Sequence, residues 1–170
     1  TLPTDFPRPQ NQRGPGASRK ISIPSLLSRQ LIDTAQEQGT TLFTLLLSAF
    51  NVLLHDLTGD ADFVVGVPVG GRIKPEFEDS VGYLVNPVPI RTRLDPAQSF
   101  KALLGSVDEK VRNALEHQEY PFARIVRELQ LTRDPRRSPV FQVMFAMERS
   151  ASLDSNGFAV TLLNTEGAGL

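Results

Sequence analysis

The sequence predicts an α/β fold in which helices cover a mixed β-sheet. Segments with apolar residues three and four positions apart, the spacing of a helix face, alternate with β-branched runs and period-two patterns that are typical of strands. The two kinds occur in mixed order as four helices and five strands, which favours helices packed on a sheet. With 170 residues, 40% of them hydrophobic, the chain has the size of one domain with a buried core.

Four segments have helical spacing. The first begins at Pro24 and ends at Gly39, where a left-handed residue stops the helix. The second begins at Thr40 or Thr41 and runs to about Leu57. Its polar positions through residue 54 form one narrow stripe, so we expect this helix to be buried on nearly every side; the stripe consists of Thr44, Ser48 and Asn51. The third and fourth helices are predicted over 99–117 and 122–130.

Five segments are predicted as strands: 19–23, 63–69, 84–94, 140–147 and 158–163. The run 63–69 is apolar on both faces, which indicates an interior strand. Gly66 and Pro68 interrupt it and mark a place where another backbone or a ligand comes close.

In the strand 84–94, alternation places Asn86 on the apolar face and Arg91 on the other face. Pro87 and Pro89 lack N–H groups that would point to the same flank, so one edge of this strand should be unpaired at that end.

Composition excludes several classes of function. The chain has 18 basic and 19 acidic residues and a net charge of −1, which provides no field for nucleic acid or an anionic membrane surface. The longest apolar stretch, 42–54, is shorter than a membrane span of about 20 residues. There is no cysteine and the two histidines are far apart, so we expect no metal site and a cytoplasmic location.

The residues alone indicate no complete catalytic group. His55 and His117 lie near predicted helix ends, where a cation or capping group is favoured by the helix dipole. The glycine-rich run 66–72 fits neither nucleotide-binding fingerprint. Five arginines could meet an acidic partner, form a solvated face, or pair with Glu128 and Asp134; they are Arg124, Arg127, Arg133, Arg136 and Arg137.

Four motifs, in order, resemble the late core motifs of condensation domains from nonribosomal peptide synthetases: Val64–Arg72, Val81–Pro87, His117–Phe122 and Arg133–Gln142. Residues 2–9 resemble the segment that joins that family's two lobes. The resemblance therefore implies an inter-lobe linker over 1–18 and a C-terminal lobe over 19–170, truncated at its C-terminal end. The implied fold is chloramphenicol-acetyltransferase-like.

The resemblance implies a part in an acyltransferase that joins a carrier-bound acyl or peptidyl thioester to the amine on the next carrier domain. Its substrates arrive on phosphopantetheine arms, and no cofactor is bound covalently to this chain. The family's HHxxxDG motif belongs to the N-terminal lobe, and neither histidine here has that pattern. We therefore expect no catalytic residue in this chain, no activity without the other lobe, and the carrier domains as further partners. Pro87, in place of the commoner threonine, resembles the residue found in condensation domains of hybrid polyketide–peptide lines or in those that accept acyl donors.

By resemblance, the substrate tunnel is lined by Asn86 and closed at its floor by the loop that contains Gly70, Gly71 and Arg72. The motif positions with a structural role are His117, Pro121, Phe122, Arg133, Asp134 and Arg137. For Asn86 both a structural and a tunnel-facing role stay open, because a buried amide needs partners that a backbone or a tunnel can provide. Residues 149–157 resemble the segment that crosses to the partner lobe. The sequence departs from the family pattern at Ala123, Arg136 and Ser138.

Two other functions stay open. One is a noncatalytic module of the same fold that recruits a tailoring enzyme to a carrier-bound peptide, and the other is an epimerisation or ester-forming relative. For the lobe itself we expect a large exposed apolar surface and a tendency to self-associate.

Overall fold

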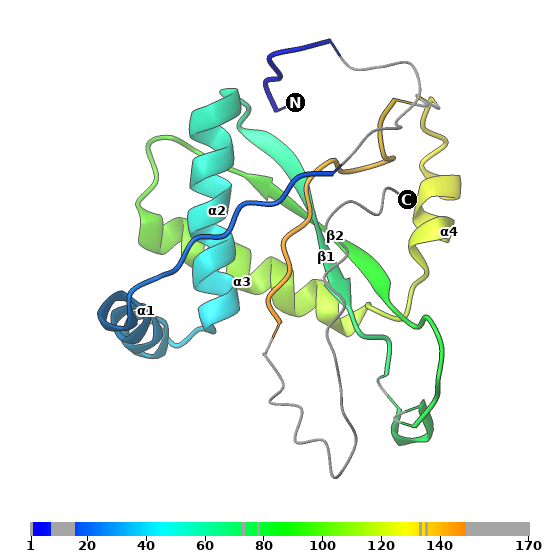
Figure 1. Cartoon of the computed structure of the whole chain (residues 1–170), viewed down its shortest axis with the longest axis horizontal. Coiled ribbons are helices and arrows are strands. Elements are labelled where there is room, and N and C mark those ends of the chain that lie inside the picture. The colour runs from blue at the N-terminus through cyan, green and yellow to red at the C-terminus, as the bar shows by residue number, and fades with distance from the viewer. Residues whose placement is uncertain are drawn as a thin grey trace.

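The computed structural model describes residues 2–7, 16–72, 74–77, 79–132, 134 and 136–148. In chain order these contain α1 (Ser25–Glu37), α2 (Leu42–Thr58), β1 (Asp62–Val69), the short 3₁₀ helix η1 (Pro75–Phe77), β2 (Asn86–Arg93), α3 (Phe100–Glu116) and α4 (Phe122–Glu128). Helices α2 and α3 pack together beside the β1–β2 pair, α1 packs against α2, and α4 contacts β2 (Figure 1). The four predicted helices are confirmed, with ends within a few residues of those expected.

Local signals account for the helix ends. The Thr41 hydroxyl accepts a hydrogen bond from the Thr44 N–H at 3.1 Å at the start of α2, and the Ser99 hydroxyl accepts one from the Ala102 N–H at 3.2 Å at the start of α3. Both satisfy an N–H that has no partner inside the helix. Gly59 ends α2 with a φ of +70°, a conformation that glycine adopts without steric cost.

Strands β1 and β2 form an antiparallel pair in which Val65 lies opposite Ile90 and Pro68 lies opposite Pro87. In such a pair, alternate residues direct their N–H groups away from the partner strand, so these prolines remove no bond from the β1–β2 ladder. Within the described residues β2 has β1 as its one strand neighbour, and the expectation that one edge of β2 is unpaired at its proline-containing end stays a prediction.

The predicted strand 140–147 is wrong as a full strand, because it joins the sheet through one parallel bridge between Gly66 and Met144. The Gly66 N–H donates to the Val143 carbonyl and the Phe145 N–H donates to the Gly66 carbonyl, both at 2.9 Å. Pro68 comes next on this edge and has no N–H to continue the ladder. The predicted close approach of another backbone at Gly66 is confirmed.

Two other strand predictions have different outcomes. Residues 19–23 are exposed and form no strand, because a period-two pattern becomes a strand only where a neighbouring edge accepts its hydrogen bonds. The predicted strand 158–163 lies outside the described residues. The described sheet therefore has two strands, while the mixed helix-and-sheet class holds.

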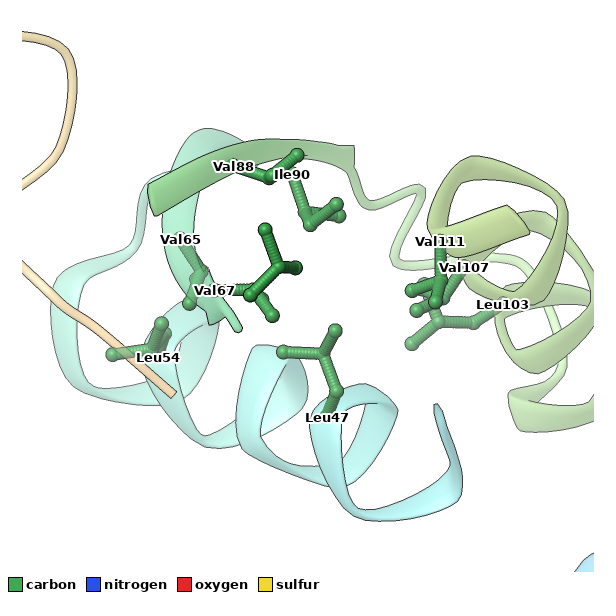
Figure 2. Packing of buried hydrophobic residues seen from close by; sticks show 10 residues of the cluster. Leu47, Leu54, Val65, Val67, Val88, Ile90, Leu103, Val107 and Val111 are labelled. Carbon is green, nitrogen blue, oxygen red and sulfur yellow. The ribbon is translucent and has the colours of Figure 1, made fainter. Parts of the chain in front are cut away.

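The core lies between the sheet and the two long helices. Val65 and Val67 of β1 and Val88 and Ile90 of β2 lie over Leu47 of α2, with side chains of α3 completing the layer (Figure 2). The full cluster of buried residues is Leu47, Leu54, Val65, Val67, Val69, Val88, Ile90, Leu103, Val107 and Val111. A smaller cluster of Ala35, Leu45 and Leu104 attaches α1.

The expectation that α2 is buried on nearly every side is wrong, because one face of the helix is exposed. Its polar stripe faces the interior, where Ser48 donates to the Thr44 carbonyl at 2.8 Å and the Asn51 amide donates to the Thr92 hydroxyl at 3.0 Å. These bonds offset much of the cost of burying polar groups. The apolar side chains of Leu53 and Leu57 point instead to the surface and are about half exposed.

Within the described residues no single helix is long and apolar enough to cross a bilayer. Helices α1 and α2 reach that length and composition only as a pair, and they are bent by 104° at the break between them.

Candidate functional site

The side chain of Asn86 ties the start of β2 to the turn between α3 and α4. Its Nδ2 donates to the carbonyl oxygens of Gln118 and Tyr120, both at 2.9 Å. Its Oδ1 accepts a hydrogen bond from the Phe122 N–H at 3.0 Å. Backbone groups therefore use both amide hydrogens and one side of the oxygen. This geometry fits the structural reading of Asn86, and its tunnel-facing role stays a prediction.

The motif 117–122 forms the turn that Asn86 clamps. His117 ends α3, and its Nδ1 lies 2.8 Å from the Asn113 carbonyl oxygen. Pro121 precedes α4 without a side-chain cap of its own, so Asn86 supplies the acceptor for the first N–H of the helix. The Phe122 ring packs on the Phe141 ring with 5.1 Å between centroids.

The Tyr120 hydroxyl, on the same turn, donates to a Glu128 carboxylate oxygen at 2.5 Å. This hydrogen bond favours the neutral phenol and raises the pKa of Tyr120 above its ordinary value. Both side chains are exposed.

The loop 70–72 is attached to the segment that leads into β2. Gly71 has a φ of +66°, and the Leu84 carbonyl oxygen occupies the place that a Cβ would take. Only glycine combines that conformation with that contact. The Arg72 guanidinium donates to the Ser80 carbonyl at 3.1 Å. By contrast, a Cβ at Gly70 would meet no atom within 4 Å, so this position faces open space.

Two hollows adjoin this loop. The smaller one, about 270 Å³, has Gly71 on one side and Asn86 on the other; its lining is Gly71, Phe77, Leu84, Asn86, Gln118, Glu119 and Pro121. Thus the structure brings together two of the four residues predicted for the substrate tunnel. Gly70 lines the other hollow.

The larger hollow, about 450 Å³, lies where the end of β1 meets β2 and α3, and we call it the β1-end cavity. Valines of both strands line it together with Val111, Ala114 and Leu115 of α3 and with residues 146–148. Phe43, Pro68, Gly70, Val85 and Ile90 complete the lining. Glu148 is the one charged residue among the lining residues.

The motif 133–142 builds a separate place. Asp134 accepts hydrogen bonds from the backbone N–H and the Nε of Arg136, both at 3.0 Å, and the Arg137 Nε lies 3.8 Å from it. The Arg136 hydrogen bonds lower the pKa of Asp134 below its ordinary value. Of the alternatives that the sequence leaves open for the five arginines of 124–137, pairing with Asp134 is confirmed for Arg136 and Arg137. Arg133 lies outside the described residues.

Asp134 and Arg137 line a third hollow, of about 500 Å³, that shares no lining residue with the two hollows beside 70–72. The predicted motif residues therefore fall in two regions of the molecule. Among the described residues, no group of three His, Asp or Glu side chains could hold a metal ion. The predicted crossing segment 149–157 lies outside the described residues.

Sequence reasoning missed two features. Val140 has a φ of +69°, and the Phe141 N–H donates to the Pro139 carbonyl at 2.8 Å, which makes a strained γ-turn at a β-branched residue. It also missed the β1-end cavity. The apolar face of α3 was visible as a helical pattern, but no sequence signal separates residues that line a hollow from residues that fill the core.

Comparisons with known proteins agree on one family. The sequence model of the condensation-domain family matches residues 1–163. Over 147 residues, 86% of this chain, the sequence is 43% identical to one of the subunits of linear gramicidin synthase from Brevibacillus parabrevis. Over 167 residues, 97% of the chain, it is 38% identical to bacitracin synthase 2 from Bacillus licheniformis. The chain spans only 2% and 6% of these relatives.

Solved structures give the same result. A four-domain nonribosomal peptide synthetase, holo-AB3403 bound to AMP and glycine, matches 90% of this chain with a TM-score of 0.86 and 33% identity, over 12% of its own length. The X-domain from teicoplanin biosynthesis matches 85% of this chain with a TM-score of 0.75 and 28% identity, over 32% of its length. A further structure shows that X-domain in complex with OxyB. The fold predicted from the four motifs is confirmed.

Proposed function

Because this chain belongs to the condensation-domain family, we propose that it forms one wall of a channel in which a carrier-bound acyl or peptidyl thioester is joined to a carrier-bound amine. In that reaction the amine nitrogen attacks the thioester carbon, a C–N bond forms, the C–S bond breaks and the thiol leaves. The substrates are delivered on phosphopantetheine arms, and the product is an amide.

The proposal assigns this chain to the C-terminal lobe of the domain. The match to the teicoplanin X-domain covers 85% of this chain but only 32% of the X-domain chain. This difference in length supports the assignment of this chain to one part of a two-lobed domain. The two histidines of the sequence are single and are not followed by the pattern of the family's histidine motif. We therefore expect the N-terminal lobe to supply the group that handles the proton.

The observation that carries the proposal is the β1-end cavity beside Gly70. The wall of a reaction channel needs a hollow that accepts substrate atoms and a rigid frame around it. The reason is that holding two substrates in the right mutual orientation supplies much of the gain in rate. Here the hollow of about 450 Å³ is built on core valines of β1 and β2. Asn86 acts in this proposal as a positioning residue, since its hydrogen bonds hold the α3–α4 turn against β2.

A chimera tests the proposal. Residues 1–163 of this chain replace the matched segment of the linear gramicidin synthase relative, and amide formation between two loaded carrier domains is measured. We expect the chimera to form the amide and the 170-residue chain alone to form none. A chimera that folds but forms no amide would contradict the proposal, and so would amide formation by the chain alone at enzymatic rates.

A noncatalytic module is the second candidate, favoured by the similarity to the teicoplanin X-domain. That domain is found in complex with OxyB. For this candidate, a second chimera carries residues 1–163 of this chain in place of the matched segment of the X-domain, and it should retain OxyB in a pull-down with purified proteins. The gramicidin synthase chimera should then form no amide. Amide formation together with loss of OxyB would exclude it.

A further inference from the structure

We propose that the β1-end cavity binds the apolar side chain of the amine-bearing substrate and that Glu148 binds the ammonium group of that substrate. This inference rests on the proposed function, because it assigns a substrate class to the same site. It goes further by saying which of the two substrates occupies the hollow and what chemistry that substrate carries.

The size and lining of the cavity favour an apolar group. Its volume of about 450 Å³ lies in the range of about 300–1,000 Å³ that is usual for small-molecule pockets. Val67, Val88 and Val111 line it and are also members of the buried core cluster. The packing of the core therefore fixes these walls before any ligand arrives, and a preformed apolar hollow binds an apolar group without a cost for ordering it.

Several residues that line the cavity are exposed to solvent. Val85, Leu115 and Met147 line it, and their side chains are 37%, 40% and 48% exposed. Gly70 lines it as well and leaves open space where another residue would place a side chain. A ligand can therefore enter beside these residues.

Charge identifies the substrate. Glu148 is exposed and lines the cavity. Among the described residues it makes no ion pair. An apolar hollow gives no stabilisation to a charged group, whereas a carboxylate beside it attracts a primary ammonium through a charge-assisted hydrogen bond. An aminoacyl thioester carries an ammonium next to its side chain, and an acyl thioester that lacks an amine does not. The cavity with its carboxylate thus fits the amine-bearing substrate.

Three probes separate these contributions in titrations of the 170-residue chain followed by NMR. Leucyl-pantetheine amide carries both the side chain and the amine, 4-methylpentanoyl-pantetheine amide lacks only the amine, and glycyl-pantetheine amide lacks only the side chain. We expect the leucyl probe to bind at least about tenfold more tightly than the glycyl probe, since even one methylene in an apolar pocket contributes about 10-fold or more. Shifts should centre on amides of residues that line the cavity.

Two pairs of variants provide matched controls. Gly70→Leu should block the entrance and weaken the leucyl probe about tenfold or more, whereas Gly82→Leu, also at a position with open space around it, should not. Glu148→Gln should weaken the leucyl probe and leave the 4-methylpentanoyl probe unchanged, whereas Glu116→Gln on α3 should change neither. If Gly70→Leu fails to fold, Ala114→Leu narrows the same cavity from α3, with Ala102→Leu as its control.

Equal binding of the leucyl and glycyl probes would overturn the proposal, and so would equal effects of Gly70→Leu and Gly82→Leu. If the 4-methylpentanoyl probe binds as tightly as the leucyl probe and Glu148→Gln changes neither, the assignment to the amine-bearing substrate is overturned. Probe binding does not depend on condensation. If the chimera is inactive but the chain binds the probes with the expected specificity, only the proposed function is refuted. If the chimera is active but Gly70→Leu and Glu148→Gln do not change probe binding to the chain, only this inference is refuted.

Discussion

The Asn86 side chain bonds to backbone groups that lie 32 to 36 positions further along the chain. It combines the function of a helix cap, which accepts the first N–H of α4, with that of a clamp, which donates to two carbonyls of the preceding turn. A single amide thus determines how the α3–α4 turn sits against β2. Asparagine suits the position because its side chain has both donors and acceptor.

We therefore expect Asn86→Ala to lower the free energy of unfolding by about 1–3 kcal/mol, because three backbone groups lose their partner. Asn86→Asp keeps the acceptor for the Phe122 N–H, but it loses both donors and sets a carboxylate oxygen against the Gln118 and Tyr120 carbonyl oxygens, so it should be destabilised at least as much as Asn86→Ala. Urea denaturation followed by circular dichroism measures both. Asn113→Ala, at an exposed site on α3, is the control and should change the value by no more than about 0.5 kcal/mol. An Asn86→Ala variant as stable as this control would show that the clamp contributes nothing.

Asp62 gives a second effect at the residue scale. Its carboxylate accepts hydrogen bonds from Arg91 Nε at 2.8 Å and from Arg93 Nε at 3.2 Å. The Arg91 hydrogen bond is the main cause that lowers the pKa of Asp62 to about 2. A carboxyl whose pKa is lower in the folded state stabilises the fold above its unfolded pKa, and this contribution is lost as the pH falls through the folded value.

Hence wild type should be more stable than Asp62→Asn at pH 5, and the difference should shrink as the pH is lowered from about 4 to about 2. The difference should be small, because these side chains are exposed and water and salt screen the pair. Urea denaturation at a series of pH values tests this, with Asp33→Asn on α1 as the control. A difference that is constant from pH 5 to pH 2 would contradict it.

At the scale of elements, β1 depends on a glycine at the point where the segment 140–148 meets it. A Cβ built on Gly66 would lie 2.6 Å from Cζ of the Phe141 ring, and the Gly66 backbone bonds to that same segment. Phe141 in turn packs on Phe122 at the start of α4. Because Gly66 has no side chain, the Phe141 ring can pack against β1 and against the start of α4 at once, and so it connects these two elements to the segment 140–148.

Gly66→Ala should lower the free energy of unfolding by about 1–3 kcal/mol, because the added methyl overlaps a buried ring. Phe141→Leu frees part of that space, so the double variant should be less destabilised than the sum of the two single variants. A double-mutant cycle in urea measures this coupling. Additive effects on the free energy of unfolding would show that the Phe141 ring does not limit the size of the side chain at position 66.

At the scale of the whole molecule, the described chain exposes many large apolar side chains. Those on α1 include Leu26, those on α2 include Leu53 and Leu57, and those before β2 include Val81 and Tyr83. A globular protein that exposes apolar surface on several elements tends to bind another surface there. In the proposed function the other lobe covers part of it.

The isolated chain should therefore self-associate and bind an apolar dye, and sedimentation equilibrium over a range of concentrations tests this. Leu53→Glu with Leu57→Glu should shift the equilibrium towards monomer, because both side chains are exposed and become charged. Gln30→Glu with Gln36→Glu adds the same charge at exposed polar positions of α1 and should shift it less. A wild-type chain that stays monomeric and binds no dye would contradict the expectation.

By itself, the sequence determined the helices, the faces of β1 and β2, and the family. A helix follows from contacts and caps within about four residues, so α1 to α4 appear in the local pattern. The family follows from four motifs whose order is a property of the sequence alone.

Only the tertiary structure decided how distant segments meet. The sequence of 140–147 predicts a strand, but Pro68, next on the same edge of β1, has no N–H to continue the pairing beyond one bridge. The polar stripe of α2 faces inward because Thr92, 41 positions away from Asn51, accepts its hydrogen bond. The β1-end cavity joins residues from α2, β1, β2, α3 and the segment 146–148. Pairing, burial and hollows depend on groups far apart in sequence, and no local pattern contains that information.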